Sequence, residues 1–224
     1  MPLFEDRSDA GRRLAAELEE YRGKDALVLA LPRGGVEVGY EIATALSLPL
    51  DVFVAKKLGA PGEPELAIGA VAENGGEWVD KDSVALLGVT DEYLKQEIAT
   101  QTREMERRVR VYRGGTPLPA LAGKTVLLVD DGIATGYTIL AALSGLRAAN
   151  PGNLVAAVPM AAEESLWRVS RESDRVVCLV TPEPFYAVGY HYAEFGQLTD
   201  EDVVRYLERA RQELSTSRGQ TRGS

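Results

Sequence analysis

The sequence predicts an α/β protein built on an open, doubly wound parallel sheet. Short, almost wholly apolar runs such as residues 26–31 (ALVLAL) are typical of strands buried on both faces. Between these runs lie segments whose apolar residues have helical spacing, and this alternation favours parallel strands joined by right-handed crossovers. The chain has 224 residues, 45% of them hydrophobic, which is enough for one sizeable domain. In such folds ligands bind beyond the carboxyl ends of the strands.

The predicted elements follow one another in order along the chain. Apolar residues at Ala10, Leu14, Leu18 and Tyr21 indicate a first helix, and Gly23 provides its stop. Strands are then predicted at residues 26–31, 51–55, 125–129, 154–158 and 175–180. Helices are predicted at residues 36–46, 137–149, 163–171 and 200–214. We expect a single domain over residues 1–214 and a polar, disordered tail over residues 215–224.

An insertion at residues 59–80 interrupts this order. Residues 59–64 (GAPGEP) have the composition of a flexible loop. Asn74-Gly75-Gly76 separates two strand-like runs, which predicts an antiparallel hairpin. Thr90 then caps a long helix that begins with two acids and carries one apolar stripe. A hairpin inserted in a parallel fold often covers a site, so we expect a lid here.

Composition excludes several classes of protein. The formal net charge of −9 argues against general binding to a nucleic acid backbone. No apolar run approaches the ~20 residues that span a membrane, and the acidic N-terminus lacks the apolar region of a signal peptide. The single cysteine, Cys178, allows no intrachain disulfide, which fits a reducing cytoplasm. We therefore expect a cytoplasmic protein without nucleic acid or membrane partners.

The loop after the predicted strand at 125–129 carries the clearest chemistry. Asp130 and Asp131 end a buried strand, where two adjacent carboxylates need partners, and sugar hydroxyls suit these pure acceptors. The residues that follow open a helix whose unpaired N–H groups form an anion cradle: Gly132, Ile133, Ala134, Thr135, Gly136, Tyr137 and Thr138. A diol site beside a phosphate site describes ribose 5-phosphate. The alternative is a strand-to-helix turn whose acids merely cap the helix.

This pattern resembles the 5-phosphoribosyl-1-pyrophosphate (PRPP) signature of type I phosphoribosyltransferases: four apolar residues, two acids and a loop that closes as T-G-x-T. The resemblance covers about residues 24–200 and is nearest to stand-alone bacterial phosphoribosyltransferase-like proteins with P-R-G-G and K-K-L-G. It implies transfer of ribose 5-phosphate from PRPP to a nitrogenous base, with release of pyrophosphate. It also implies Mg²⁺ held through substrate oxygens without a direct protein ligand, and a homodimer.

The resemblance assigns a pyrophosphate site to the loop after the first strand. Arg33, Gly34 and Gly35 occupy it, with a non-proline cis peptide at the Arg33-Gly34 position. A guanidinium pairs bidentately with phosphate, and glycines let backbone amides approach. Lys56 is assigned to pyrophosphate, whereas Lys57 joins Arg33 and the two acids as catalytic candidates. The alternatives are an ordinary turn with a surface arginine and a solvated lysine pair on an edge strand.

The remaining candidates lie in the insertion and in an aromatic segment. The insertion matches the family's mobile catalytic loop, although we expect Glu65 and Glu73 at the surface. Residues 182–198 resemble the variable hood that accepts the nucleophile, where Tyr186, Tyr190 and Tyr192 could stack on a planar base. A plug over the sheet end is an equal alternative. We expect packing roles for Trp78, Trp167 and Cys178, and a structural or exposed position for His191, the only histidine.

Two other functions compete with an enzyme of this kind. A non-catalytic PRPP or nucleotide sensor would keep residues 130–138 but need not complete the pyrophosphate and lid elements, so Arg33 and the insertion favour an enzyme. A phosphosugar hydrolase would need a nucleophile or a cluster of metal ligands, and the sequence indicates neither. The sequence also lacks the G-K-[S/T] and G-x-G-x-x-G patterns of nucleotide-binding loops.

Overall fold

The core of the molecule is a five-stranded sheet with strand order β2-β1-β6-β7-β8. The computed structural model describes residues 2–221. All four strand pairs are parallel, which confirms the predicted doubly wound α/β class. The strands are β1 (Ala26–Ala30), β2 (Leu50–Val52), β6 (Thr125–Val129), β7 (Asn153–Met160) and β8 (Arg175–Val180). Because the strand order reverses between β1 and β6, a ligand crevice is expected at their carboxyl ends.

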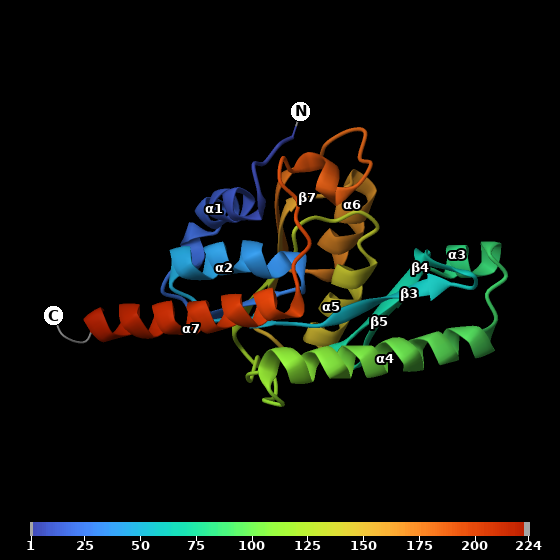
Figure 1. Ribbon diagram of the computed structural model, residues 1–224, viewed down its shortest axis with the longest axis horizontal. Helices are drawn as coiled ribbons and strands as arrows, with labels where there is room; N and C mark the ends of the chain where they lie inside the picture. The colour runs from blue at the N-terminus through green and yellow to red at the C-terminus, as the bar shows by residue number, and fades with distance from the viewer. Residues whose placement is uncertain (1, 222–224) are drawn as a thin grey trace.

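Helices cover both faces of this sheet (Figure 1). Alternate strand residues explain the two layers, since Val28 and Leu127 face one core and Leu29 and Leu128 face the other. The first core is covered by α1 (Arg7–Glu17), α2 (Gly34–Leu46) and α7 (Asp200–Thr221). The second core is covered by α5 (Tyr137–Arg147) and α6 (Glu163–Glu172). Short 3₁₀ helices occupy Glu19–Tyr21, Glu73–Gly75 and Val188–His191.

The insertion forms a small antiparallel sheet of its own. It contains β3 (Ala55–Ala60), β4 (Glu63–Ala72) and β5 (Gly76–Val79), followed by α3 (Lys81–Leu86) and α4 (Asp91–Arg113). The predicted hairpin is confirmed as β4 and β5, and Thr90 caps α4 through its hydroxyl. The prediction of a flexible loop at residues 59–64 is wrong, as is a single strand at 51–55. Pairing with β4 and burial of Leu58 under α4 hold β3 in place.

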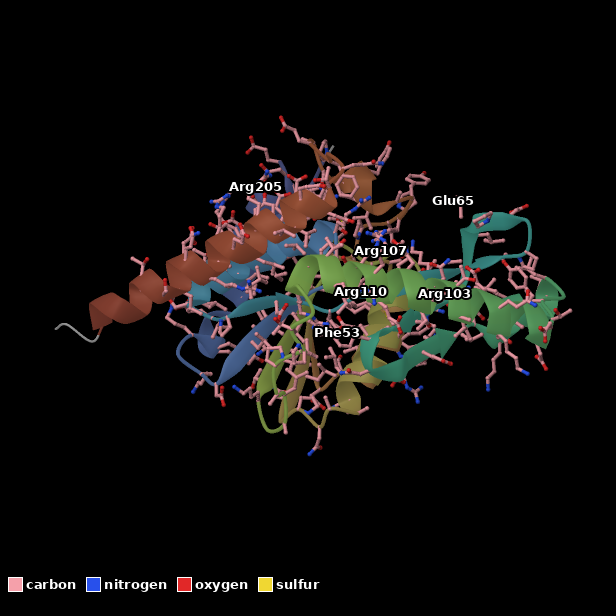
Figure 2. All side chains as sticks on the ribbon, turned by 60° about the horizontal axis from the view of Figure 1, so that its bottom comes forward. Phe53, Glu65, Arg103, Arg107, Arg110 and Arg205 are labelled. Atoms are coloured by element: carbon pink, nitrogen blue, oxygen red, sulfur yellow. The ribbon has the colours of Figure 1, made fainter. Side chains whose placement is uncertain are left out.

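The small sheet is fixed to the core on one side by α5. A Cβ atom on Gly76 would lie 2.2 Å from the carbonyl oxygen of Ala141, so the two backbones pack at close range. On the other side α4 runs across the sheet, while the β3–β4 turn and the exposed Glu65, near the start of β4, extend away from the core (Figure 2). The insertion is therefore a packed layer at its root and solvent-exposed at its tip.

Glu73 lies in the buried root of the insertion, which contradicts its predicted surface position. Its Oε1 accepts a 2.6 Å hydrogen bond from the backbone N–H of Val54, and Oε2 pairs with Arg113 at the end of α4. The side chain of Arg113 is only 3% exposed. Burial raises the pKa of Glu73 despite the opposing hydrogen bond and charge. This pair connects the end of α4 to the junction between β2 and β3.

Helix α7 continues to Thr221, beyond its predicted end at Leu214. The prediction of a disordered tail is therefore wrong for residues 215–221, and residues 222–224 lie outside the described part of the chain. Packing of Val203 and Leu207 on the core establishes the helix. Each further residue then adds a backbone hydrogen bond without a new nucleation cost. Within residues 2–221, no helix has the length and apolarity needed to cross a membrane.

Candidate active site

Asp130 and Asp131 lie at the carboxyl end of β6, at the predicted point of strand reversal. They line a cavity of about 160 Å³. The same cavity is lined by Lys57, by Ile139 and Val188, and by all residues of the predicted loop except Tyr137. A larger hollow of about 540 Å³ lies between α2 and α7, but it contains none of the predicted site residues. We place the candidate site at the smaller cavity because its lining brings acids, a base and a helix start together.

The two acids carry an electrostatic cost. Burial raises the pKa of Asp130 well above its ordinary value, and the adjacent charge of Asp131 raises it further. Burial also raises the pKa of Asp131, although the charge and the hydrogen bond of Arg7 oppose the rise. The only side-chain hydrogen bond of Asp130 among the described residues is from the backbone N–H of Asp131, at 2.9 Å. The pair therefore suits a ligand that donates hydrogen bonds or brings positive charge.

Arg7 contacts the acid pair and was not predicted from the sequence. Its Nε donates to Oδ2 of Asp131 at 2.8 Å, and its Nη1 donates to the carbonyl oxygen of Gly196 at 2.8 Å. The guanidinium lies 3.8 Å from the ring centroid of Phe195, and only 7% of the side chain is exposed. Arg7 stands three positions before Ala10, on the inward stripe of the first helix. An arginine on the otherwise apolar face of a helix indicates a buried partner, and this was the signal in the sequence that could have predicted it.

Backbone hydrogen bonds to neighbouring segments hold the loop after the acids in place. The backbone N–H of Ile133 donates to Met160, and its carbonyl accepts from Ala162, both at 2.9 Å. The carbonyl of Ala134 accepts from Ser165 Oγ at 2.6 Å. Gly136 caps α5 with a φ of +78°, a conformation that favours glycine. The N–H groups of the first turn of α5 have no intrahelical acceptors, so they are the donors available to an anion.

Tyr137 belongs to this loop but not to the cavity. Its ring is buried, and its hydroxyl donates to Oδ2 of Asp80 at 2.5 Å. Asp80 caps α3, since its side chain accepts from the backbone N–H groups of Asp82 and Ser83. The side chain of Tyr137 therefore connects the loop to the insertion, and only its backbone amide is left for an anion.

The loop after β1 packs directly on the acid pair. A Cβ atom on Gly34 would lie 1.9 Å from Oδ2 of Asp131, and one on Gly35 would lie 2.8 Å from the carbonyl oxygen of Val129. A larger residue at either position would displace the acids. The cis peptide of this loop joins Pro32 to Arg33, one bond before the position that the resemblance assigned. None of Arg33, Gly34 and Gly35 lines the cavity.

The two lysines of β3 point in different directions, as strand geometry requires. Lys57 is exposed and lines the cavity beside the acids, and its charge opposes the rise in the pKa of both acids that burial causes. Lys56 is half-buried, and its pKa is lowered by burial and by the nearby charge of Arg108 on α4. Both residues lie on an edge strand of the small sheet. Only Lys57 is therefore placed beside the acid pair.

The three predicted hood tyrosines differ in exposure. Tyr186 and Tyr190 are 71% and 70% exposed and contact each other edge to face. Tyr192 is buried, and its hydroxyl donates to the backbone carbonyl of Asp131 at 2.7 Å. It therefore supports the acid pair from behind, as part of a plug, instead of offering a stacking face. Val188, which was not predicted, lines the cavity and lies against Gly132.

The remaining single-residue predictions have mixed outcomes. His191 is buried against Phe185, with ring centroids 5.1 Å apart, which fits a structural role. Cys178 and Trp78 pack against the second core as predicted. Trp167 is 60% exposed on α6, so the packing role predicted for it is wrong. Among residues 2–221, no group of three or more His, Cys, Asp or Glu side chains gathers as a metal-ligand cluster.

Comparison with known proteins identifies the family. Residues 4–194 match the model of the phosphoribosyl transferase domain. The chain belongs to this family. The phosphoribosyl transferase domain thus includes the acid pair, the cavity and most of the hood, and the predicted resemblance is confirmed. The predicted enzyme class, a phosphoribosyltransferase, agrees with this family.

Individual relatives agree with the family model. The chain is 42% identical over 215 residues to proteins of Mycobacterium tuberculosis strains CDC 1551 and H37Rv that are provisionally named phosphoribosyl transferases. That alignment covers 96% of this chain and 48% of each relative, so the chain spans about half the length of the curated relatives it matches. The crystal structure of TT1426 from Thermus thermophilus is 41% identical, with a TM-score of 0.77. The match covers 93% of this chain and 99% of that one.

Proposed function

We propose that this phosphoribosyl transferase domain transfers ribose 5-phosphate from PRPP to a nitrogenous acceptor and releases pyrophosphate. The observation that carries the proposal is the half-buried acid pair of Asp130 and Asp131, which lines one cavity together with the residues that open helix α5. We also propose a cytoplasmic location, which the single cysteine supports. The predicted homodimer stays a prediction.

The acid pair would hold the ribose ring. Ionised carboxylates accept hydrogen bonds only, so Asp130 and Asp131 suit the two hydroxyls of the sugar. Arg7 would keep Asp131 oriented and offset part of its charge, since the contact is 2.8 Å long and part-buried. The geometry leaves Asp130, with no such cation in direct contact, as the stronger acceptor for the ligand.

The loop from Gly132 to Thr138 would bind the 5-phosphate. The start of α5 offers unpaired backbone N–H groups and the positive end of the helix dipole, and both favour a bound phosphate. The hydroxyls of Thr135 and Thr138 are on residues that line the same cavity. Fixing the phosphate at one end and the hydroxyls at the other orients the anomeric carbon, and orientation supplies much of the catalytic effect in such a reaction.

Pyrophosphate would leave toward the cations around the loop after β1. Lys57 lines the cavity, and Arg33 lies on the loop that packs against Asp131. As the bond to the sugar breaks, positive charge develops on the ribose and negative charge on the diphosphate. Lys57 and Arg33 would stabilise the second charge, and the ionised acids would stabilise the first.

Magnesium fits the donor set of this cavity. Mg²⁺ prefers oxygen ligands and keeps several waters, so it needs few protein ligands. Oδ2 of Asp130 accepts no hydrogen bond from the residues that the structure describes, and burial raises the pKa of this acid, so its ionised form would gain from a nearby cation. When bound, Mg²⁺ would neutralise part of the diphosphate charge. The protein residues would bind, orient and exclude water around it.

The acceptor would approach from the hood. Val188 lies at the boundary between the cavity and the hood, and the exposed pair of Tyr186 and Tyr190 lies on the same segment. Aromatic side chains beside an apolar one favour a planar acceptor. The small antiparallel sheet, connected to the loop through Tyr137 and Asp80, would limit access of water from the other side.

The first experiment is a calorimetric titration of PRPP into the protein with Mg²⁺. We expect saturable binding that Asp130→Asn with Asp131→Asn abolishes while thermal unfolding shows an intact fold. Asp25→Asn, at an exposed acid paired with Lys124, is the matched control and should bind as the wild type does. Unchanged affinity in the double variant would contradict the proposal. Binding without pyrophosphate release against any screened base would instead assign a non-catalytic PRPP sensor.

A further inference from the structure

Four cations gather where α4, β3 and the loop after β1 meet. Arg107 and Arg108 lie on the helix, Lys56 lies on β3 beneath it, and Arg33 lies in the loop itself. Their charges interact, because the pKa of Lys56 is lowered first by burial and then by Arg108, Arg33 and Arg107, which outweigh the opposing charge of Glu104. Figure 2 shows Arg107 on the side of α4 that faces α7. The local charge is therefore positive here, although the net charge of the whole chain is −9.

Asp200, the first residue of α7, stands among these cations. Its Oδ2 lies 3.4 Å from Nη2 of Arg107, and its Oδ1 lies 3.9 Å from Nη1 of Arg33. Each carboxylate oxygen thus faces a different arginine. The hydroxyl of Tyr112 also donates to Oδ1 at 2.7 Å. Glu104 pairs with Arg107 and Arg108 one turn along α4, so two carboxylates stand against four cations.

We propose that the diphosphate site extends to α4, with Arg107 beside Arg33, and that Asp200 is an internal counter-ion which an incoming diphosphate displaces. The inference rests on the proposed function, because it needs the reaction to involve a diphosphate. It adds two residues, Arg107 and Asp200, that neither the signature loop nor the loop after β1 contains.

The exchange is favourable on electrostatic grounds. A carboxylate offers one negative charge and two oxygens, whereas a diphosphate offers more charge and more oxygens in the geometry that guanidinium groups pair with. The side chains of Arg33 and Arg107 are 39% and 48% exposed, so a ligand can reach both. Ion pairs at that exposure contribute little, so their replacement costs little. Once displaced from the arginines, the Asp200 carboxylate still lies at the start of α7, where the helix dipole favours an acid.

The test is a titration of inorganic pyrophosphate with Mg²⁺ into the full chain. Removal of the competing charge by Asp200→Asn should tighten pyrophosphate binding by roughly twofold to tenfold, the range set by one or two exposed ion pairs. Arg107→Gln should weaken binding by a similar factor. Asp202→Asn is the matched control, because Asp202 lies on the same helix turn but pairs with Thr199 and Arg205. Tyr112→Phe removes the hydrogen bond that holds Asp200 and keeps the charge of Asp200, so it should tighten pyrophosphate binding less than Asp200→Asn does. Asp202→Asn should bind as the wild type does.

The outcomes separate this inference from the proposed function. Unchanged or weaker pyrophosphate binding in Asp200→Asn overturns the inference, as does equal tightening in Asp202→Asn, which would show a general charge effect. Ribose 5-phosphate is titrated in parallel, since it depends on Asp130 and the loop after β6 and carries no diphosphate. Failure of ribose 5-phosphate to bind the wild type contradicts the proposed function. The effect of Asp200→Asn on pyrophosphate affinity tests the inference separately.

Discussion

At the scale of single residues, the site combines two half-buried acids with one buried cation, Arg7. Asp130 and Asp131 have raised pKa values because burial disfavours their charge, and Arg7 offsets only part of that cost. Such a cluster is unfavourable for stability and favourable for binding a hydroxyl-rich, cation-bearing ligand. Residues retained at a cost to stability are common where function requires them.

Asp130→Asn should therefore stabilise the protein at neutral pH while it removes ligand binding. An acid whose pKa is raised by folding contributes stability below its unfolded pKa, and this contribution is lost as pH rises through the folded value. We expect a gain of about 1–2 kcal/mol at pH 7, within the usual range for relief of a functional strain, and almost none near pH 4. Urea unfolding at both pH values measures it. An equal change at both would contradict the assigned cause.

Gly34→Ala tests the contact between the two loops. Its Cβ would lie 1.9 Å from Oδ2 of Asp131 and 3.1 Å from Nε of Arg7, so the ion pair must shift. We expect a loss of about 1–3 kcal/mol in the free energy of unfolding and of about tenfold or more in ribose 5-phosphate affinity. Gly196→Ala is the control, since it keeps the carbonyl that accepts from Arg7 and no atom lies within 4 Å of its Cβ position. Equal effects of both substitutions would exclude a specific contact.

The sequence predicts local parts of the site better than distant ones. Asp130, Asp131 and the loop to Thr138 are contiguous, so a strand followed by a helix start is enough to place them. Arg7 reaches Asp131 across 124 positions, and no local pattern indicates that partner. Tyr137 was assigned by its position in the motif, but the direction of its side chain depends on Asp80 in the insertion.

At the scale of elements, the small sheet and α4 behave as one unit attached to the core. Asn74 and Gly75 have positive φ values of 60° and 74°, which explains why the hairpin was predictable from its turn. The strand β3 was not, because residues 59–64 contain the glycines and prolines that usually mark loops. Its conformation comes from pairing with β4 and from the cover that α4 provides, and both are long-range effects.

The buried pair of Glu73 and Arg113 should control how firmly this unit is attached. Arg113→Met leaves a buried carboxylate without its cation, and we expect it to lower the free energy of unfolding by about 3–5 kcal/mol. Adding Glu73→Gln removes that charge and keeps an acceptor for the N–H of Val54, so the double variant should recover much of the loss. Chemical denaturation of both variants measures the difference. Additive losses would show that the two residues act independently.

At the scale of the whole molecule, the α/β class and the strands β6 and β8 were predictable to the residue. Both strands are bounded by polar residues, whereas the ends of helices depend on what packs beside them. The end of α7 illustrates this dependence. Glu213 accepts hydrogen bonds from Tyr40 at 2.5 Å and from Thr44 at 2.9 Å, which anchors the helix close to its predicted end.

Removal of residues 215–224 should leave the rest of the fold unchanged. The buried core residues Leu207 and Ala210 of α7 lie before the cut, and the hydrogen bonds of Glu213 are also kept. We expect the midpoint of thermal unfolding to change by less than about 2 °C, which corresponds to a few tenths of a kcal/mol in a domain of this size. A larger drop would show that the final turns of the helix contribute to stability.

The pairing of Arg7 with Asp131 has a consequence for the kinetics of folding. Contacts between residues far apart in sequence form late, because loop closure must precede them. The strands could assemble while the first helix is still undocked, and the acids would then lack their guanidinium partner. In a refolding experiment, recovery of secondary structure should therefore precede recovery of ligand affinity. The delay between the two signals would measure the docking of the N-terminal helix.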